Sequence, residues 1–151
     1  MGIKKSGFTL LELIIVIILI GALSAIALPR ILENDIKEVA FYDQVAASVR
    51  YAQRLSVNSG CEIQVRLSNS PAGVSLWRRA GANDDCGSGE FTQAVVNPTT
   101  GTSYTILAES GITMDAQTIV FNSEGNPNPN GVSIIIAGRP LLIEAGSGYV
   151  E

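Results

Sequence analysis

Few side chains of this chain could do chemistry, and their types restrict which chemistry is possible. The 151 residues contain no histidine and only two cysteines, Cys61 and Cys86. Without histidine, neither a Ser-His-Asp nor a Cys-His arrangement can form. A tetrahedral zinc site also lacks ligands, because there is no third cysteine. We therefore expect no enzyme activity, no cofactor and no metal.

The other groups that could form a site are carboxylates and amides in loops. Asp84, Asp85 and Glu90 lie in one glycine-rich segment. They could act as acid and base or hold Ca²⁺ through oxygen ligands. A solvated turn is the stronger interpretation of this loop. It is also the stronger interpretation of the Gly- and Pro-rich segment that contains Asn122, Asn126, Asn128 and Asn130.

One carboxylate lies where a charge is unexpected. Glu12 is the only charged residue between positions 8 and 28. A helix of that length spans about 31 Å, which matches one bilayer. A charge near the centre of such a segment costs about 2.5–3.5 kcal/mol, and less near an end. Glu12 is therefore a candidate functional residue.

Two ordinary kinds of segment match the apolar run without explaining Glu12. A secretory signal would use Lys4 and Lys5 as its positive region, and residues 25–27 as an A-x-A-like cleavage site. A plain membrane anchor would be held by the same lysines in the cytoplasm. In both cases the carboxylate has no role.

The residues "KKSGFTLLEL" resemble the type III signal of type IV pilins and pseudopilins. The resemblance implies that a prepilin peptidase cuts after Gly7 and that the new amine, on Phe8, is methylated. It further implies that Glu12 pairs with the N-terminal amine of a neighbouring subunit during assembly. The spacing agrees, because residues four apart lie on one face of a helix. Pairing would offset the cost of burying either charge alone.

The elements that position these residues can be predicted from periodicity. Apolar residues continue on one helical face beyond the apolar run, at Phe41, Val45, Val49, Ala52 and Leu55. The sequence "NSG" at 58–60 is an end signal. We expect a helix over residues 8–59, with possible kinks at Gly21 and Pro29.

The rest of the chain predicts β structure. Short runs rich in Val, Ile, Phe, Trp and Thr are separated by turn residues, at about 61–67, 73–79, 90–96, 118–122, 131–138 and 139–145. The segment "AGRP" predicts a hairpin in which Gly138 takes a positive φ. We expect an α+β fold with a leader at 1–7, a transmembrane and filament-core helix at 8–28, its continuation at 29–59, and a small antiparallel β head at 60–151.

The whole pattern is similar to the GspH/FimT-type minor pilins and pseudopilins. The late "VFNSEGNPN" and the strands around Gly138 and Arg139 carry this likeness. The "YAQRLSVNSGC" block, Cys86 and "FTQAVVNP" resemble most the minor pilin C proteins of the mannose-sensitive haemagglutinin (MSHA) pilus. The resemblance implies a structural subunit for pilus priming, assembly or composition, in a filament used for adhesion. A pseudopilin of a type II secretion system is the alternative.

This family also implies partners and a compartment. The partners are other major and minor pilins, the prepilin peptidase, the inner membrane and the assembly platform. The head would lie in the periplasm before it joins a pilus or pseudopilus. In that oxidising compartment we expect Cys61 and Cys86 to form a disulfide. Two buried free thiols are the alternative.

A DNA-binding minor pilin is a second alternative. Some minor pilins of this type capture DNA, and a patch of Arg50, Arg54, Arg66, Arg78 and Arg79 with Trp77 could bind phosphates and stack on a base. The net charge argues against it. It is −4 for the chain, and −6 if removal of the leader takes away Lys4 and Lys5.

Overall fold

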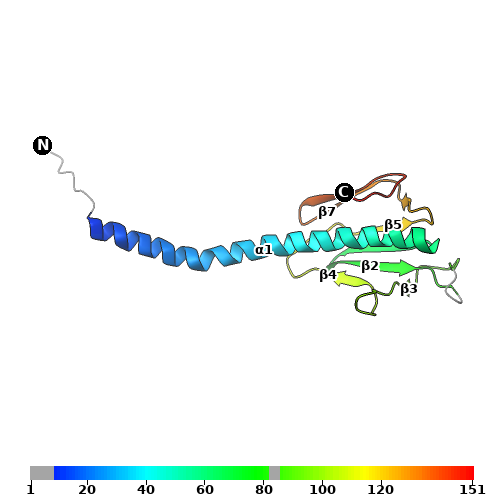
Figure 1. Cartoon of the computed structure of the whole chain (residues 1–151), viewed down its shortest axis with the longest axis horizontal. Coiled ribbons are helices and arrows are strands. Elements are labelled where there is room, and N and C mark those ends of the chain that lie inside the picture. The colour runs from blue at the N-terminus through cyan, green and yellow to red at the C-terminus, as the bar shows by residue number, and fades with distance from the viewer. Residues whose placement is uncertain (1–8, 82–85) are drawn as a thin grey trace. The chain divides into compact units, whose positions relative to one another are not determined.

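The computed structural model of this chain describes residues 9–81 and 86–151, and for residues 25–34 it describes the backbone alone. The chain divides into two compact units, Met1–Lys37 and Glu38–Glu151. Helix α1, Leu10–Ser59, begins in the first unit and ends in the second (Figure 1). The predicted helix end at residue 59 agrees with the structure, and the predicted start at residue 8 lies outside the described residues.

In the second unit the helix covers one face of a β-sheet. The predicted stripe is oriented inward: Phe41, Val45, Val49 and Ala52 are buried, and Leu55 is half-buried against the same core. This stripe is the reason that the second compact unit begins at Glu38 and contains the end of the helix together with residues 60–151. A β-sheet of this size needs a helix to cover its apolar face.

The sheet is antiparallel throughout, as predicted, and has the order β3-β2-β1-β5-β6, with β4 also paired to β2. Alternate side chains of β1, namely Ile63, Val65 and Leu67, face the core. Gln64 and Arg66 therefore lie on the outer face. The strands are β1 Ile63–Asn69, β2 Ala72–Arg78, β3 Gln93–Ala94, β4 Thr105–Leu107, β5 Gln117–Phe121 and β6 Pro127–Asn128.

A second sheet is formed by the predicted hairpin, β7 (Val132–Ile136) and β8 (Arg139–Ile143). Gly138 has the predicted positive φ of 76°, and Ala137 also has a positive φ, of 48°. Two positive φ values in succession are what a two-residue turn with the twist of a hairpin requires. The chain then returns along β8, where Leu142 and Glu151 exchange both backbone hydrogen bonds.

Two parts of the sheet differ from the prediction. The strand expected over 90–96 is reduced to Gln93–Ala94, because Val95 donates to Leu76 and the chain then turns away through a bridge between Val96 and Ser103. Strands β4 and β6 were not predicted. They have three and two residues, too few to show an alternating pattern.

Candidate functional site

Glu12, the predicted assembly residue, lies in the first turn of helix α1. The backbone N–H of Glu12 donates to the carbonyl oxygen of Thr9 at 3.1 Å and to its hydroxyl at 3.3 Å. Thr9 thus caps the helix, and the sequence T-x-x-E at 9–12 is that of a capping box. This local role of Thr9 was not predicted, although the motif is visible in the sequence. Gly7 and Phe8 lie outside the described residues.

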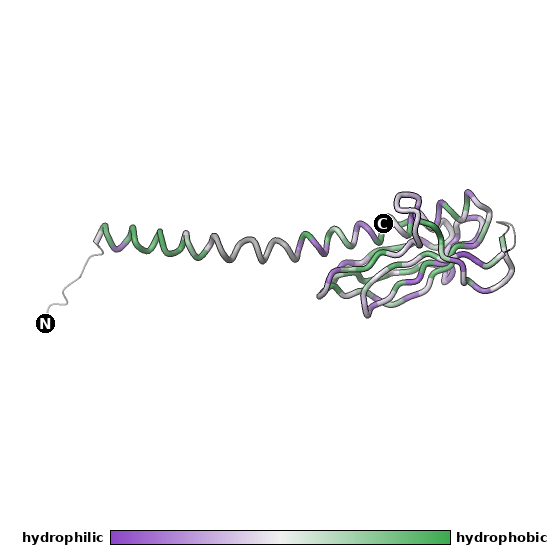
Figure 2. The backbone as a smooth tube through the Cα atoms, turned by 90° about the horizontal axis from the view of Figure 1, so that it is seen from below, coloured by the Kyte–Doolittle hydropathy of each residue, from purple (hydrophilic) through white to green (hydrophobic). Residues whose placement is uncertain are grey.

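Apart from Glu12 and Ser24, the side chains of this helix segment are apolar, and they lie on every side of the helix. All described side chains from residue 9 to residue 24 are exposed, and Figure 2 colours this stretch as hydrophobic almost throughout. A helix that is apolar all round is normally buried in lipid or among other helices. The carboxylate of Glu12 has no ion pair with a described residue.

None of the helical stretches described qualifies, by length and hydropathy, as a membrane span. The predicted span over 8–28 includes residue 8 and the side chains of 25–28, which lie outside the described residues. The predicted kink position Gly21 is within α1, and an added Cβ there would meet no atom within 4 Å. Pro29 also lies within the helix, and its side chain is not among those described.

The two cysteines are bonded to each other in the structure, with their Cα atoms 5.1 Å apart. Cys61 is two residues after the end of α1, and Cys86 belongs to the segment that returns to the sheet at β3. The Cys61 backbone N–H also donates to the hydroxyl of Ser59. The disulfide therefore joins the end of the helix to the loop between β2 and β3.

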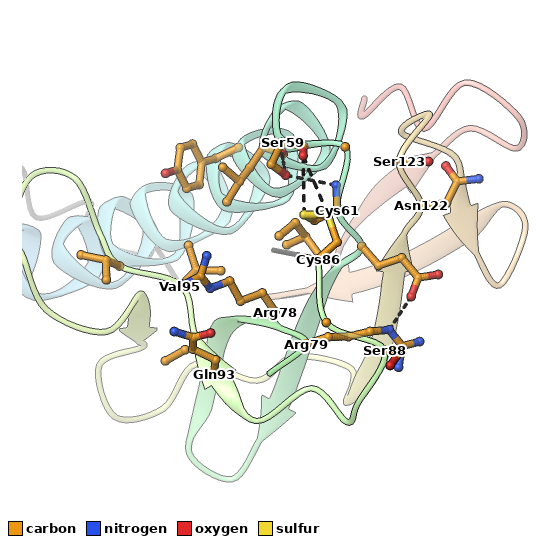
Figure 3. Close-up of a pocket in the computed structure, with 18 residues that line it drawn as sticks. Ser59, Cys61, Arg78, Arg79, Cys86, Ser88, Gln93, Val95, Asn122 and Ser123 are labelled. Atoms are coloured by element: carbon orange, nitrogen blue, oxygen red, sulfur yellow. Dashed lines mark hydrogen bonds and ion pairs between the residues drawn. A yellow bond between two sulfur atoms is a disulfide. The ribbon is translucent and has the colours of Figure 1, made fainter. Parts of the chain in front are cut away.

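A cleft of about 740 Å³ lies beside this disulfide, between the last turns of α1 and strands β1–β3 (Figure 3). Two polar groups beside it are already bonded. The Ser59 hydroxyl donates to the carbonyl oxygen of Leu55, and Glu62 pairs with Arg79 at 2.6 Å. Neither the Ser59 hydroxyl nor the Glu62 carboxylate is therefore poised as a nucleophile or a general base.

The five arginines of the DNA-binding alternative do not form one patch. Arg50 and Arg54 are on α1, which covers the inner face of the sheet. Arg78 pairs with Ile63 and so shares that side, whereas Trp77 and Gln64 are opposite each other on the outer face. Arg66 is there too, with its guanidinium carbon 4.5 Å from the Trp77 ring centroid. Figure 3 shows Arg78 among the residues that line the cleft beside the disulfide.

The arginines of the outer face hold the loop after β2. Arg66 donates to Gln64 at 2.6 Å and to the carbonyl oxygen of Phe91 at 2.7 Å. Arg79 lies over the Phe91 ring at 4.3 Å and donates to the carbonyl oxygen of Gly89. These contacts fix the returning segment against the sheet, a structural use of cation–π stacking.

Two of the loop asparagines bond the backbone of turns, and one of them, Asn130, accepts the N–H of Gly146 at 3.1 Å. Asp84 and Asp85 lie outside the described residues, and the described residues contain no group of three or more acidic, Cys or His side chains suited to a metal. The side-chain oxygen of Asn122 accepts the backbone N–H groups of Glu124 and Asn126, at 3.0 and 2.8 Å. This is an Asx-type turn, as the composition suggested.

Two family profiles match the chain. The prokaryotic N-terminal methylation motif matches residues 3–28, and the type II transport protein GspH matches residues 42–148. A relative from Thermus thermophilus, the type IV narrow pilus major component PilA5, is 46% identical over 54 residues, which are 35% of this chain and 47% of the relative. The chain thus spans about half the length of that relative.

Solved structures of low sequence identity share the fold. The type IV minor pilin FimU of Pseudomonas aeruginosa is 12% identical, with a TM-score of 0.54 over 80% of this chain and 90% of that one. The minor pseudopilin EpsH of the Vibrio cholerae type 2 secretion system is 13% identical, with a TM-score of 0.50 over 78% and 93%. The chain is therefore a type IV pilin-like subunit of a pilus or pseudopilus and belongs to the GspH family.

Proposed function

We propose that the chain is a minor pilin of an MSHA-type pilus, related to minor pilin C, and takes part in priming, assembly or composition of the filament. The observation that carries this proposal is the combination in one chain of a methylation motif at 3–28 with a GspH-type head at 42–148. The blocks around Cys61 and Cys86 favour the MSHA type. The filament would serve attachment to surfaces.

In this role the chain is inserted in the inner membrane before assembly, with its head in the periplasm. The prepilin peptidase cuts between Gly7 and Phe8, and the Phe8 amine is methylated. The apolar helix then leaves the lipid for a bundle of pilin helices at the assembly platform. An apolar interface alone lets helices slide, whereas a buried charge pair is satisfied at one offset. Glu12 would fix that offset by pairing with the amine of a neighbouring pilin.

The intact mass and N-terminal sequence of the protein, isolated from membranes of a bacterium with this machinery, test the processing step. A chain that begins at methylated Phe8 is expected. A soluble chain that begins at Leu28 would indicate an ordinary signal peptide and would overturn the proposal. As a second test, a Glu12→Val variant should still insert in the membrane and fail to enter the filament.

A pseudopilin of a type II secretion system is the second candidate, and the name of the matched family favours it. Deletion of the gene for this chain can distinguish the pilus role from the secretion role. Loss of sheared surface pili with normal protein secretion supports the pilus. The reverse result supports the pseudopilin.

A further inference from the structure

The outer face of the C-terminal sheet differs from that of the main sheet. Strands β7 and β8 and the returning residues 149–151 bury one row of side chains, among them Ile134, Ile136 and Leu141, with no exposed surface. The alternate residues must lie on the opposite face. We call this opposite face the C-terminal face, and it contains Ser133, Ile135, Pro140, Leu142, Glu144, Tyr149 and Glu151.

The C-terminal face carries Ile135, Pro140, Leu142 and Tyr149 where a solvated sheet would be polar, beside the polar Ser133, which is opposite Leu142. Ile135, Leu142 and Tyr149 are 42%, 46% and 58% exposed, and Ile135 is directly opposite Pro140. An antiparallel sheet with one solvated face normally alternates apolar residues inward with polar residues outward. On the main sheet, β1 follows this rule with Gln64 and Arg66 outward, although Trp77 and Leu107 also lie on the outer face. The C-terminal sheet departs from the rule on β7, on β8 and at the returning Tyr149, which indicates an interaction surface.

The charges of the C-terminal face have one sign. A groove of about 440 Å³ is lined by Ser133, Leu142 and Tyr149 together with Glu144 and Glu151. Among the described residues, neither carboxylate forms an ion pair, and Glu144 accepts only the Ser147 hydroxyl, at 2.7 Å. The guanidinium of Arg50 is directed to the carbonyl oxygen of Val150, whose side chain is on the inner side.

We propose that the C-terminal face docks the head of a neighbouring pilin subunit that inserts a lysine or arginine side chain into this groove. The alkyl stem of such a side chain would lie on Leu142 and the ring of Tyr149, and its charged end would reach Glu144 and Glu151. Carboxylates repel phosphate, so nucleic acid and anionic lipid head groups do not fit. The proposal rests on the proposed function, because helical assemblies require each subunit to touch its neighbours through unlike surfaces.

The test uses the full chain in a bacterium that assembles the filament. A photoreactive phenylalanine analogue replaces Tyr149, and the crosslinked product is sought in the sheared filament and membrane fractions. The expected product joins this chain to another pilin through a peptide that contains lysine or arginine. Leu142→Lys and Glu144→Lys, each added to this variant, should lower the yield of the crosslinked product about tenfold. Leu142→Lys removes an apolar side chain from the groove, and Glu144→Lys reverses a charge there.

The matched control is Leu107→Lys, which changes an exposed leucine of β4 outside the C-terminal face, 60% exposed. Its crosslinking yield should stay unchanged, and the melting temperatures of the purified full-length variants should match that of the parent. The absence of a product, a product with a non-pilin or a lipid, or an equal loss with Leu107→Lys would overturn the inference. If Glu12→Val abolishes filament entry while the groove variants leave crosslinking intact, the docking inference is wrong and the proposed function stands. If the parent chain never enters a filament, the proposed function fails.

Discussion

The guanidinium of Arg50 on helix α1 holds the carbonyl oxygen of Val150, with Nε at 3.4 Å and Nη2 at 3.2 Å. Two more helix side chains reach the same part of the chain. Gln53 donates to the carbonyl oxygen of Ser147 at 2.7 Å, and Tyr42 donates to that of Pro140 at 3.0 Å. Because the C-terminal sheet shares no ladder with the main sheet, these bonds help to position it on the helix.

Replacement of Arg50 by glutamine should therefore loosen the last residues of the chain. We expect the free energy of unfolding to fall by about 1–2 kcal/mol, the usual cost of losing a charge-assisted hydrogen bond at a partly exposed site. Amide hydrogen exchange should rise at residues 149–151. Arg54→Gln is the control, since Arg54 has no hydrogen bond or ion pair to a described residue. Equal effects of both substitutions would show that net charge matters and the bond does not.

The two glycines near the C-terminus provide a second comparison. Gly146 and Gly148 both have positive φ, 84° and 66°. A Cβ at Gly146 would meet nothing within 4 Å, whereas one at Gly148 would collide with the carbonyl oxygen of Gly125 and lie 3.3 Å from the ring of Phe121. Gly146→Ala should cost about 1–2 kcal/mol from backbone strain alone. Gly148→Ala should cost clearly more in the same denaturant titration, and similar values would contradict the close approach.

The sequence predicts the fold well where the pattern is long. The stripe from Phe41 to Ala52 repeats over several helical turns, and β1 alternates over its core-facing residues, so both could be found from periodicity. The turn at Gly138 follows from its residue types. Strands β4 and β6 could not be found, because two or three residues carry no period and their pairing is imposed by the neighbouring strand.

The candidate sites also divide into those that the sequence pattern shows and those that depend on strand pairing. The methylation motif and Glu12 are visible because a charge within an apolar run is rare. The patch of the DNA-binding alternative is not one surface, because residue type alone does not show which face of a sheet a side chain occupies. Register decides that, and Arg78 and Trp77, adjacent in sequence, lie on opposite faces. The C-terminal face was missed for a similar reason, since Tyr149 joins Leu142 only through the pairing of residues 149–151 with β8.

The third prediction concerns how much the disulfide stabilises the fold. Cys61 and Cys86 are separated by 25 residues, and closing a loop of that length stabilises the fold by about 3.5 kcal/mol in the chain-entropy estimate. The double substitution Cys61→Ser with Cys86→Ser should lower the free energy of unfolding of the full chain in detergent by about that amount. A reductant should destabilise the parent chain and leave the double variant unchanged. Insensitivity of the parent to reductant would contradict a stabilising role.

The last prediction separates two roles of Glu12. Its backbone is part of the helix cap with Thr9, and its carboxylate is proposed to pair with the amine of a neighbouring subunit. Glutamine is accepted at this position of a capping box but carries no charge. Glu12→Gln and Glu12→Val should therefore both remain in the membrane and both be depleted from sheared filaments, whereas the control Leu13→Val should be incorporated normally. Normal incorporation of Glu12→Gln together with loss of Glu12→Val would assign the residue to helix capping, and the charge pair would be wrong.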